Sequence, residues 1–190
     1  MDAVEHVTRE KDGRRWRIGT AADVSWIADA TTVGLTITSA IPPVFDAYAT
    51  VLAPEEFNDN AEHERALMSV LREHAQGDRW WLGYLDTGAD DIVFPDAPKV
   101  SLFADWWYVL VEAGSDQAAT WRDPECWRGA LPDLVFPADR AWLLSYLWDD
   151  EWRCIGGTNL LIDALLDSPL LDARQVGLDE DVTPPGRHAR

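Results

Sequence analysis

Cysteine and histidine offer this chain its most direct route to nucleophilic or metal chemistry, and both are scarce. Cys126 and Cys154 form neither a CxxC pair nor a spacing typical of a metal site. A thiolate nucleophile at Cys154 would need a nearby histidine to lower its pKa. His63 and His74 lie about 16 Å apart on one predicted helix, too far to share a metal. The sequence predicts no catalytic residue, metal or cofactor, leans against an enzyme, and leaves open whether the two cysteines pair.

Carboxylates gather at one predicted turn. Asp149, Asp150 and Glu151 are flanked by Trp148 and Trp152. Such a tip could bind a cation or an arginine of a partner, although it lacks the glycine-containing loop of calcium sites. A solvated turn is the simpler interpretation, because charge runs usually face water.

Tryptophan is the most unusual feature, with eleven residues in the chain. The doublets Trp80-Trp81 and Trp106-Trp107 fall in predicted strands, where neighbouring side chains point to opposite faces. An outward tryptophan suits a partner surface or a pocket. The alternative is that helices cover both faces and every indole is core. The candidate binding residues are Trp81, Trp106, Trp107, Trp148, Asp149, Asp150 and Glu151.

The charge balance narrows the choice of partner. Thirty-four acidic residues face sixteen basic ones, which gives a formal net charge of −18. A negative field repels phosphate backbones and anionic lipid, so nucleic-acid and membrane partners are not expected. A basic protein partner is favoured, unless the charge serves solubility alone.

Three helices are predicted from caps and from apolar residues at helical spacing. Thr20 and Asp23 can form a capping box for a helix over 21–31. A second helix over 59–75 carries an apolar stripe that includes Leu67 and Leu71. A third follows Thr158, with Leu161, Ile162, Leu165 and Leu166 on its buried side, after a turn predicted at Gly156-Gly157.

Strand patterns fill most of the remaining chain. We expect strands at 16–18, 80–86, 100–103 and 106–111, and a hairpin of 142–147 with 151–155 around the acidic tip. Segments 100–103 and 106–111 form either one bent strand or a tight hairpin. Residues 44–52 fit either a helical or a strand period, and their aromatic and β-branched content favours a strand. A short piece at 116–121 has no assigned type. Strands in local clusters predict an α+β fold with a largely antiparallel sheet and about three helices packed on it. One domain is expected over 15–176, between a flexible N-terminus at 1–14 and a disordered tail at 177–190.

Two segments resemble elements of a known family. Residues 41–49 read IPPVFDAYA, and residues 136–142 read FPADRAW before Gly156-Gly157-Thr158 and Leu161-Ile162-Asp163. They resemble the IPxxFxAYA and PADRxW…GG[ST]xxLID elements of an uncharacterised actinobacterial family, across about residues 35–170. The chain departs from that pattern at Ala53-Pro54, where a histidine would be expected before the proline. The resemblance implies an actinobacterial cytosolic origin and no activity.

The sequence also leads to an expected cellular location and to two hypotheses about function. The chain has neither a signal-peptide pattern nor an apolar stretch of membrane length, so a cytoplasmic location is expected. The first hypothesis is an acidic protein-binding or regulatory domain, such as an inhibitor, antitoxin or immunity protein. The alternative is a small-molecule-binding protein or enzyme with a tryptophan-lined pocket, in which Asp105 or Asp139 would transfer protons.

Overall fold

Over the residues that the structure describes, the protein is built on one antiparallel sheet of ten strands with four α-helices, so the predicted α+β class is confirmed. The computed structural model describes residues 6–55, 59–88, 92–123, 125–126, 128–148 and 150–187. The strands are β1 (Thr8–Lys11), β2 (Arg14–Ile18), β3 (Ala47–Leu52), β4 (Trp80–Leu85), β5 (Val100–Leu102), β6 (Trp106–Ala113), β7 (Leu134–Pro137), β8 (Leu143–Ser145), β9 (Trp152–Gly157) and β10 (Asp172–Gln175). The helices are α1 (Ala21–Ala28), α2 (Asn60–Glu73), α3 (Ser115–Thr120) and α4 (Asn159–Asp167), with a short 3-10 helix η1 (Ile37–Ser39).

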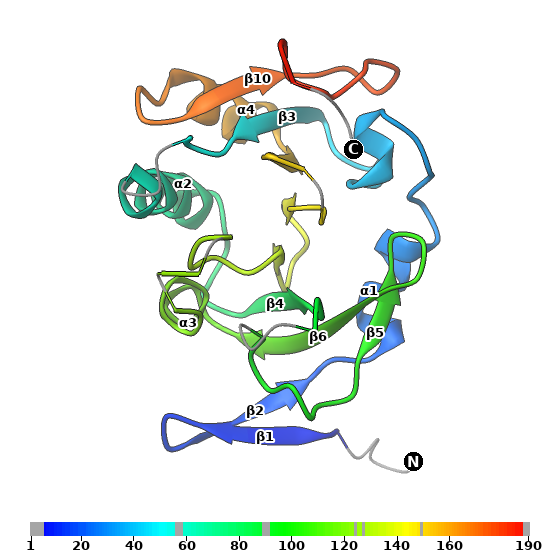
Figure 1. The fold of residues 1–190 in the computed structure, drawn as a ribbon, viewed down its shortest axis with the longest axis vertical. Coiled ribbons are helices and arrows are strands. Elements are labelled where there is room, and N and C mark those ends of the chain that lie inside the picture. Colours follow the sequence, from blue (N-terminus) through cyan, green and yellow to red (C-terminus); the bar gives the residue numbers. More distant parts are fainter. Residues whose placement is uncertain are drawn as a thin grey trace.

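Strand order differs from chain order. Neighbouring strands run β1-β2-β6-β4-β7-β8-β9-β3-β10, and β5 pairs with β6 outside this path. Figure 1 places β1 and β2 at one end of the molecule and β3 and β10 at the other, with α2 and α3 along one side and α1 along the other. The first and last strands of the chain therefore end this path, and β5 forms a further edge beside β6.

Side chains alternate between two buried clusters on the two faces of the sheet. On β6, Val109 and Val111 pack in the cluster that contains Leu67 and Leu71 of α2. Tyr108 and Leu110 of the same strand pack in the cluster that contains Val24 and Ile27 of α1. Because both faces are covered, all six residues of β4 are buried, and the strand has no polar face.

The predicted helix caps are present. The Thr20 amide donates to Asp23 Oδ2 over 2.8 Å, and Thr158 Oγ1 accepts the Leu161 amide over 3.3 Å. Each bond satisfies a backbone group that the first turn of a helix leaves without an internal partner. The piece at 116–121 belongs to the helix α3.

The N-terminal boundary differs from the sequence prediction. Residues 8–11 form β1 and pair with β2, so the ordered domain begins before residue 15. Asp12 and Gly13, with φ of 54° and 70°, make the tight turn of this hairpin. The charged sequence TREK of β1 carries no apolar alternation, and for this reason the strand was not predicted. Strands β7 and β10 were also not predicted.

The glycine pair Gly156-Gly157 is not the predicted turn but the end of the buried strand β9. A Cβ at Gly156 would overlap the side chains of Ile41 and Phe45, and one at Gly157 would overlap Leu161. The pair therefore serves close packing on a strand rather than chain reversal.

The C-terminal segment contacts the sheet over residues 177–187, which fall within the predicted disordered tail. Val182 is buried, and Asp181 forms an isolated bridge with Thr36. Arg174 Nη2 donates to the carbonyl oxygens of residues 181 and 182 over 3.2 and 3.1 Å. Residues 188–190 lie outside the described residues. The sequence of this segment is polar and contains prolines, and for this reason it does not predict these contacts.

Candidate functional site

Only one of the ten described tryptophans is largely exposed. Trp107 on β6 has 53% of its surface exposed. Both indoles of the first doublet are buried, Trp80 on one face of the sheet and Trp81 on the other, where Trp81 stacks on Phe136. Opposite orientation within the doublet is as predicted, but the helices cover both faces, so the candidate binding residue Trp81 belongs to the core.

The other three predicted tryptophans come together around one hollow of about 340 Å³. It is called the tryptophan hollow here, and its lining residues are Leu85, Asp86, Thr87, Asp105, Trp106, Trp107 and Trp148. Trp106 and Trp148 are half-buried and Trp107 is exposed. The hollow thus combines aromatic surface with two carboxylates.

The two carboxylates of the tryptophan hollow are held by local bonds. Asp86 pairs with Lys99 Nζ at 3.0 Å, and this hydrogen bond lowers the pKa of the Asp86 carboxyl. Asp105 accepts a long hydrogen bond of 3.5 Å from Ser101 Oγ. Carboxylate oxygens at this position suit a cationic ligand rather than an anionic one.

The turn that carries Asp105 is strained. Phe103, Ala104 and Asp105 have φ values of 49°, 61° and 72°, three successive non-glycine residues in the left-handed region. Each such conformation costs of the order of 1 kcal/mol and persists only where the surroundings fix it. The antiparallel pairing of β5 with β6 on either side of this turn supplies that constraint.

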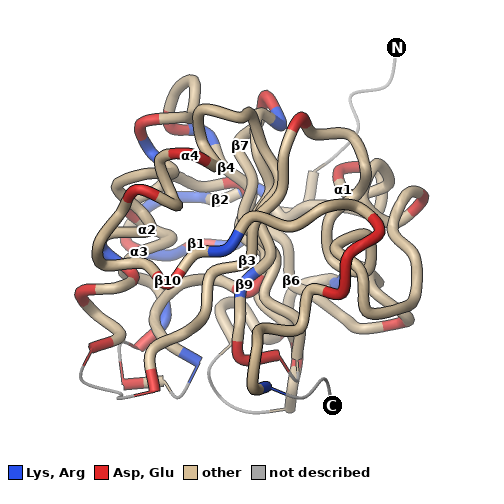
Figure 2. Tube along the Cα trace, turned by 90° about the horizontal axis from the view of Figure 1, so that it is seen from above, with Lys and Arg blue, Asp and Glu red and all other residues tan. Residues whose placement is uncertain are grey.

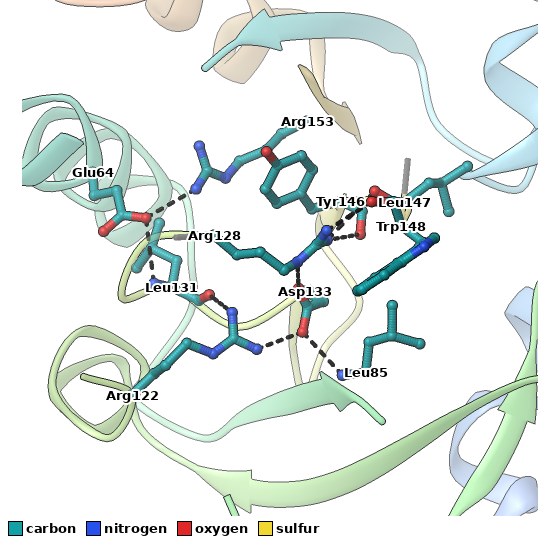
Figure 3. A network of polar contacts seen from close by, with 10 residues as sticks. All are labelled: Glu64, Leu85, Arg122, Arg128, Leu131, Asp133, Tyr146, Leu147, Trp148 and Arg153. Atoms are coloured by element: carbon teal, nitrogen blue, oxygen red, sulfur yellow. Dashed lines mark hydrogen bonds and ion pairs between the residues drawn. The ribbon is translucent and has the colours of Figure 1, made fainter. Parts of the chain in front are cut away.

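A buried ion network lies behind Trp148 and was not predicted. Asp133, with 1% of its side chain exposed, accepts from Arg122 Nη2 at 2.5 Å and Arg128 Nε at 2.8 Å, and from the Leu85 amide at 2.9 Å. Burial alone raises the pKa of Asp133, but the two guanidiniums outweigh it and the pKa lies below its ordinary value. Figure 3 shows these groups converging on the single carboxylate.

A second buried pair joins helix α2 to strand β9. Glu64 accepts from Arg153 Nη2 at 2.9 Å and from the Ala130 amide at 2.9 Å. Gly129, with φ of 84°, passes so close to Glu64 that a Cβ there would overlap the carboxylate. Arg153 has 3% of its side chain exposed, and its Nε and Nη1 atoms have no hydrogen-bond partner.

Arginine and aromatic side chains stack beside these ion pairs. The guanidinium carbons of Arg128 and Arg153 lie 4.4 and 4.7 Å from the ring centre of Tyr146, and that of Arg128 lies 5.4 Å from the ring of Trp148. Figure 3 shows the four side chains as one series. Cation–π attraction of this kind is strongest where water is excluded.

This series forms part of the wall of a second hollow of about 540 Å³, called the arginine hollow here. Its lining residues are Ala53, Pro54, Glu55, Asn60, Arg128, Tyr146, Trp148, Asp150, Glu151, Arg153 and Arg187. Two residues of the predicted acidic tip, Asp150 and Glu151, lie here rather than in the tryptophan hollow. The third, Asp149, lies outside the described residues. Trp148 contributes to both hollows.

Neither cysteine forms a disulfide, and burial raises the pKa of the Cys154 thiol well above its ordinary value. A thiol so buried is a poor nucleophile. His63 is also buried, and burial together with the charge of Arg153 lowers its pKa to about 4. Among the described residues, no group of three or more His, Cys, Asp or Glu side chains is arranged to hold a metal ion.

Acidic residues are spread over many loops rather than gathered on one face, as Figure 2 shows. The net charge of −18 thus gives a general negative field, and the described Asp and Glu residues are distributed over many segments of the chain. Within the described part of the chain, no helix has the length and apolar character needed to cross a membrane.

Comparison with family models, curated proteins and solved structures gives no match for this chain. The resemblance to an actinobacterial family therefore stays a prediction from the two sequence elements. Any functional conclusion has to come from the two hollows themselves.

Proposed function

We propose that this chain is a protein-binding domain that docks a basic segment of its partner against the tryptophan hollow. The supporting observation is Trp107, a large aromatic side chain left 53% exposed beside two further indoles and two carboxylates. Tryptophan is enriched among residues that dominate binding energy. An arginine or lysine of the partner can lie on the indole faces and still reach Asp105.

The overall charge supports the same class of partner. A net charge of −18 accelerates the encounter with a basic protein and disfavours an acidic one. This mode of action would suit an inhibitor, antitoxin, immunity protein or regulator. Because the acidic residues are dispersed, the net charge would raise the rate of association with the partner. The tryptophan hollow would provide the specific contacts.

A partner would be sought by affinity purification at low salt from the cells that produce the protein, followed by titration of the purified candidate. Trp107→Ala is the informative variant, and Leu160→Ala, which removes a side chain 74% exposed on α4, is the matched control. Loss of a central aromatic anchor is expected to weaken binding by about 2 kcal/mol, or about thirtyfold. The control should bind like the wild type, and added salt should slow association.

A partner whose affinity is equal for the wild type and Trp107→Ala would refute this proposal. Binding that is insensitive to salt would refute the role given to charge.

For the small-molecule alternative, one of the two predicted proton-transfer residues, Asp105, lines the tryptophan hollow, and a second hollow is also available. Asp139 is exposed and accepts the Ala141 amide, and it is not among the residues that line the tryptophan hollow with Asp105. The arginine hollow is the observation that favours ligand binding, because buried guanidiniums and aromatic rings form its wall.

A further inference from the structure

A further hollow of about 470 Å³ adjoins the tryptophan hollow and is called the apolar hollow here. Its lining includes Val33, Leu102, Phe103, Asp105, Trp106 and Leu147. Asp105 and Trp106 also line the tryptophan hollow, and Leu147 precedes Trp148, which lines that hollow as well. The apolar hollow and the tryptophan hollow therefore share a wall.

The apolar hollow offers a largely uncharged surface. Among the described residues that line it, Asp105 is the one ionisable side chain. Two of its hydroxyl groups are already used within the protein, because Thr31 Oγ1 donates to the Ile27 carbonyl oxygen over 3.0 Å and Thr32 Oγ1 lies 2.8 Å from Thr38 Oγ1. The apolar hollow therefore suits an uncharged aliphatic or aromatic side chain.

Incompletely buried apolar side chains surround the apolar hollow. Val33, in its lining, has 91% of its surface exposed, and Leu35, two residues further along the same loop, has 54% exposed. Phe103 and Trp106 are half-buried in the lining itself. Apolar side chains gathered at the surface in this way are typical of an interaction site.

The shared wall carries a carboxylate. Asp105 is exposed at the end of the strained turn of residues 103–105, and its bond to Ser101 Oγ is long, at 3.5 Å. Its carboxylate is therefore accessible to a cation that lies in the tryptophan hollow. On the other side of this carboxylate, the apolar hollow offers contacts to an uncharged side chain.

We propose that the tryptophan hollow and the apolar hollow form one docking groove for an extended segment of the partner, in which one residue separates a basic side chain from an apolar one. The basic side chain would lie on the indoles and pair with Asp105, and the apolar side chain would occupy the apolar hollow. In an extended segment, side chains two residues apart point the same way and lie about 7 Å apart, so both can cross a shared wall. This inference rests on the proposed function, because it specifies the segment that the tryptophan hollow docks.

Blocked pentapeptides serve as the probes, with dissociation constants measured by titration of the indole N–H signals in NMR spectra. Acetyl-GRGLG-amide and acetyl-GLGRG-amide carry both side chains in the two possible orders, and acetyl-GRGGG-amide carries arginine alone. One of the first two peptides is expected to bind about tenfold more tightly than the third, because it also buries a leucine side chain. Trp107→Ala should weaken the binding of all three peptides.

Two valine variants test the apolar hollow. Val33→Asp places a charge in its lining, so the leucine-containing peptide should lose its advantage over the arginine-only peptide. Val44→Asp is the matched control, because Val44 is 62% exposed, lines neither the apolar nor the tryptophan hollow, and gives the same change in net charge. The control should keep the advantage of the leucine-containing peptide.

The outcomes separate this inference from the docking role of the tryptophan hollow. If the arginine-only peptide binds as tightly as both leucine-containing peptides and Trp107→Ala weakens all three, this inference is overturned and the docking of a basic segment stands. Equal effects of Val33→Asp and Val44→Asp would also overturn this inference alone. If no peptide binds, or if Trp107→Ala binds them like the wild type, both proposals fail.

Discussion

The substitution Asp133→Asn tests whether the buried carboxylate holds the centre of the domain together. It changes one atom of a side chain that is 1% exposed and receives three hydrogen bonds, two of them from Arg122 and Arg128. The asparagine amide is neutral, and its NH₂ group would face a guanidinium donor instead of accepting from it. Two buried cations would then lose their shared counter-charge.

The expected cost follows from the two ion pairs that the substitution removes. Removing one partner of a buried ion pair costs about 3–5 kcal/mol, and because Asp133 serves two guanidiniums we expect the upper end, about 5 kcal/mol. A domain of this size has about 5–15 kcal/mol of stability in total. With a urea m-value of about 2.5 kcal/mol per molar, the unfolding midpoint should fall by about 2 M.

Urea unfolding followed by circular dichroism measures this shift, with Asp163→Asn as the matched control. Asp163 is exposed on α4, so the same chemical change there should alter stability by less than about 0.5 kcal/mol. The dependence of stability on pH in acid provides a second test. The folded pKa of Asp133 is lowered, so its stabilisation is present above the unfolded value of 3.8 and is lost as pH falls through the folded pKa. The wild type and Asp133→Asn should therefore converge in strong acid.

A loss of less than about 1 kcal/mol for Asp133→Asn at neutral pH would contradict the reasoning. It would mean that the two guanidiniums find other partners or water, and that the network does not carry the stability assigned to it.

Two further predictions concern the same region. Gly129→Ala should destabilise the fold by more than about 2 kcal/mol in urea unfolding, because it combines positive φ with overlap against Glu64, whereas Gly77→Ala, at similar φ in open space, should cost only about 1 kcal/mol. The pKa of His63 is lowered to about 4 in the folded state, so stability should be fully present above pH 6.5 and fall by up to about 1.4 kcal/mol per pH unit between 6.5 and 4. His63→Gln should flatten that decline; an unchanged pH profile would contradict the assignment.

Local sequence patterns predicted most of the helices and strands. Caps and apolar spacing located three helices, and alternation located the strands around Trp80 and Trp106. Strands β1 and β10 were not predicted because they are edge strands with charged sequences. Strand β7 was not predicted because it ends in a proline and, with both faces buried, has no alternation of apolar and polar residues. Helix α3 is too short for a periodic pattern.

The sites were less predictable because long-range pairing builds them. Trp148 reaches Trp106 and Trp107 only through the order of strands in the sheet, which no local pattern contains. One feature of the sequence does indicate the buried ion network. Glu64 lies three residues before Leu67 on the apolar stripe of α2, and Arg153 interrupts the apolar run of β9, so each charge occupies a position that the pattern assigns to a buried side chain.

The two strands that end the sheet limit how far it can grow. Strand β1 reads TREK and β10 reads DARQ, so each outer edge presents charged side chains alongside its unpaired amides and carbonyls. A strand from another molecule that added to either edge would have to bury or oppose those charges. Strand β4 lies three places in from β1 and β9 lies two places in from β10, so neither adjoins these two charged edges. Addition of a strand from another molecule at β1 or β10 is therefore disfavoured.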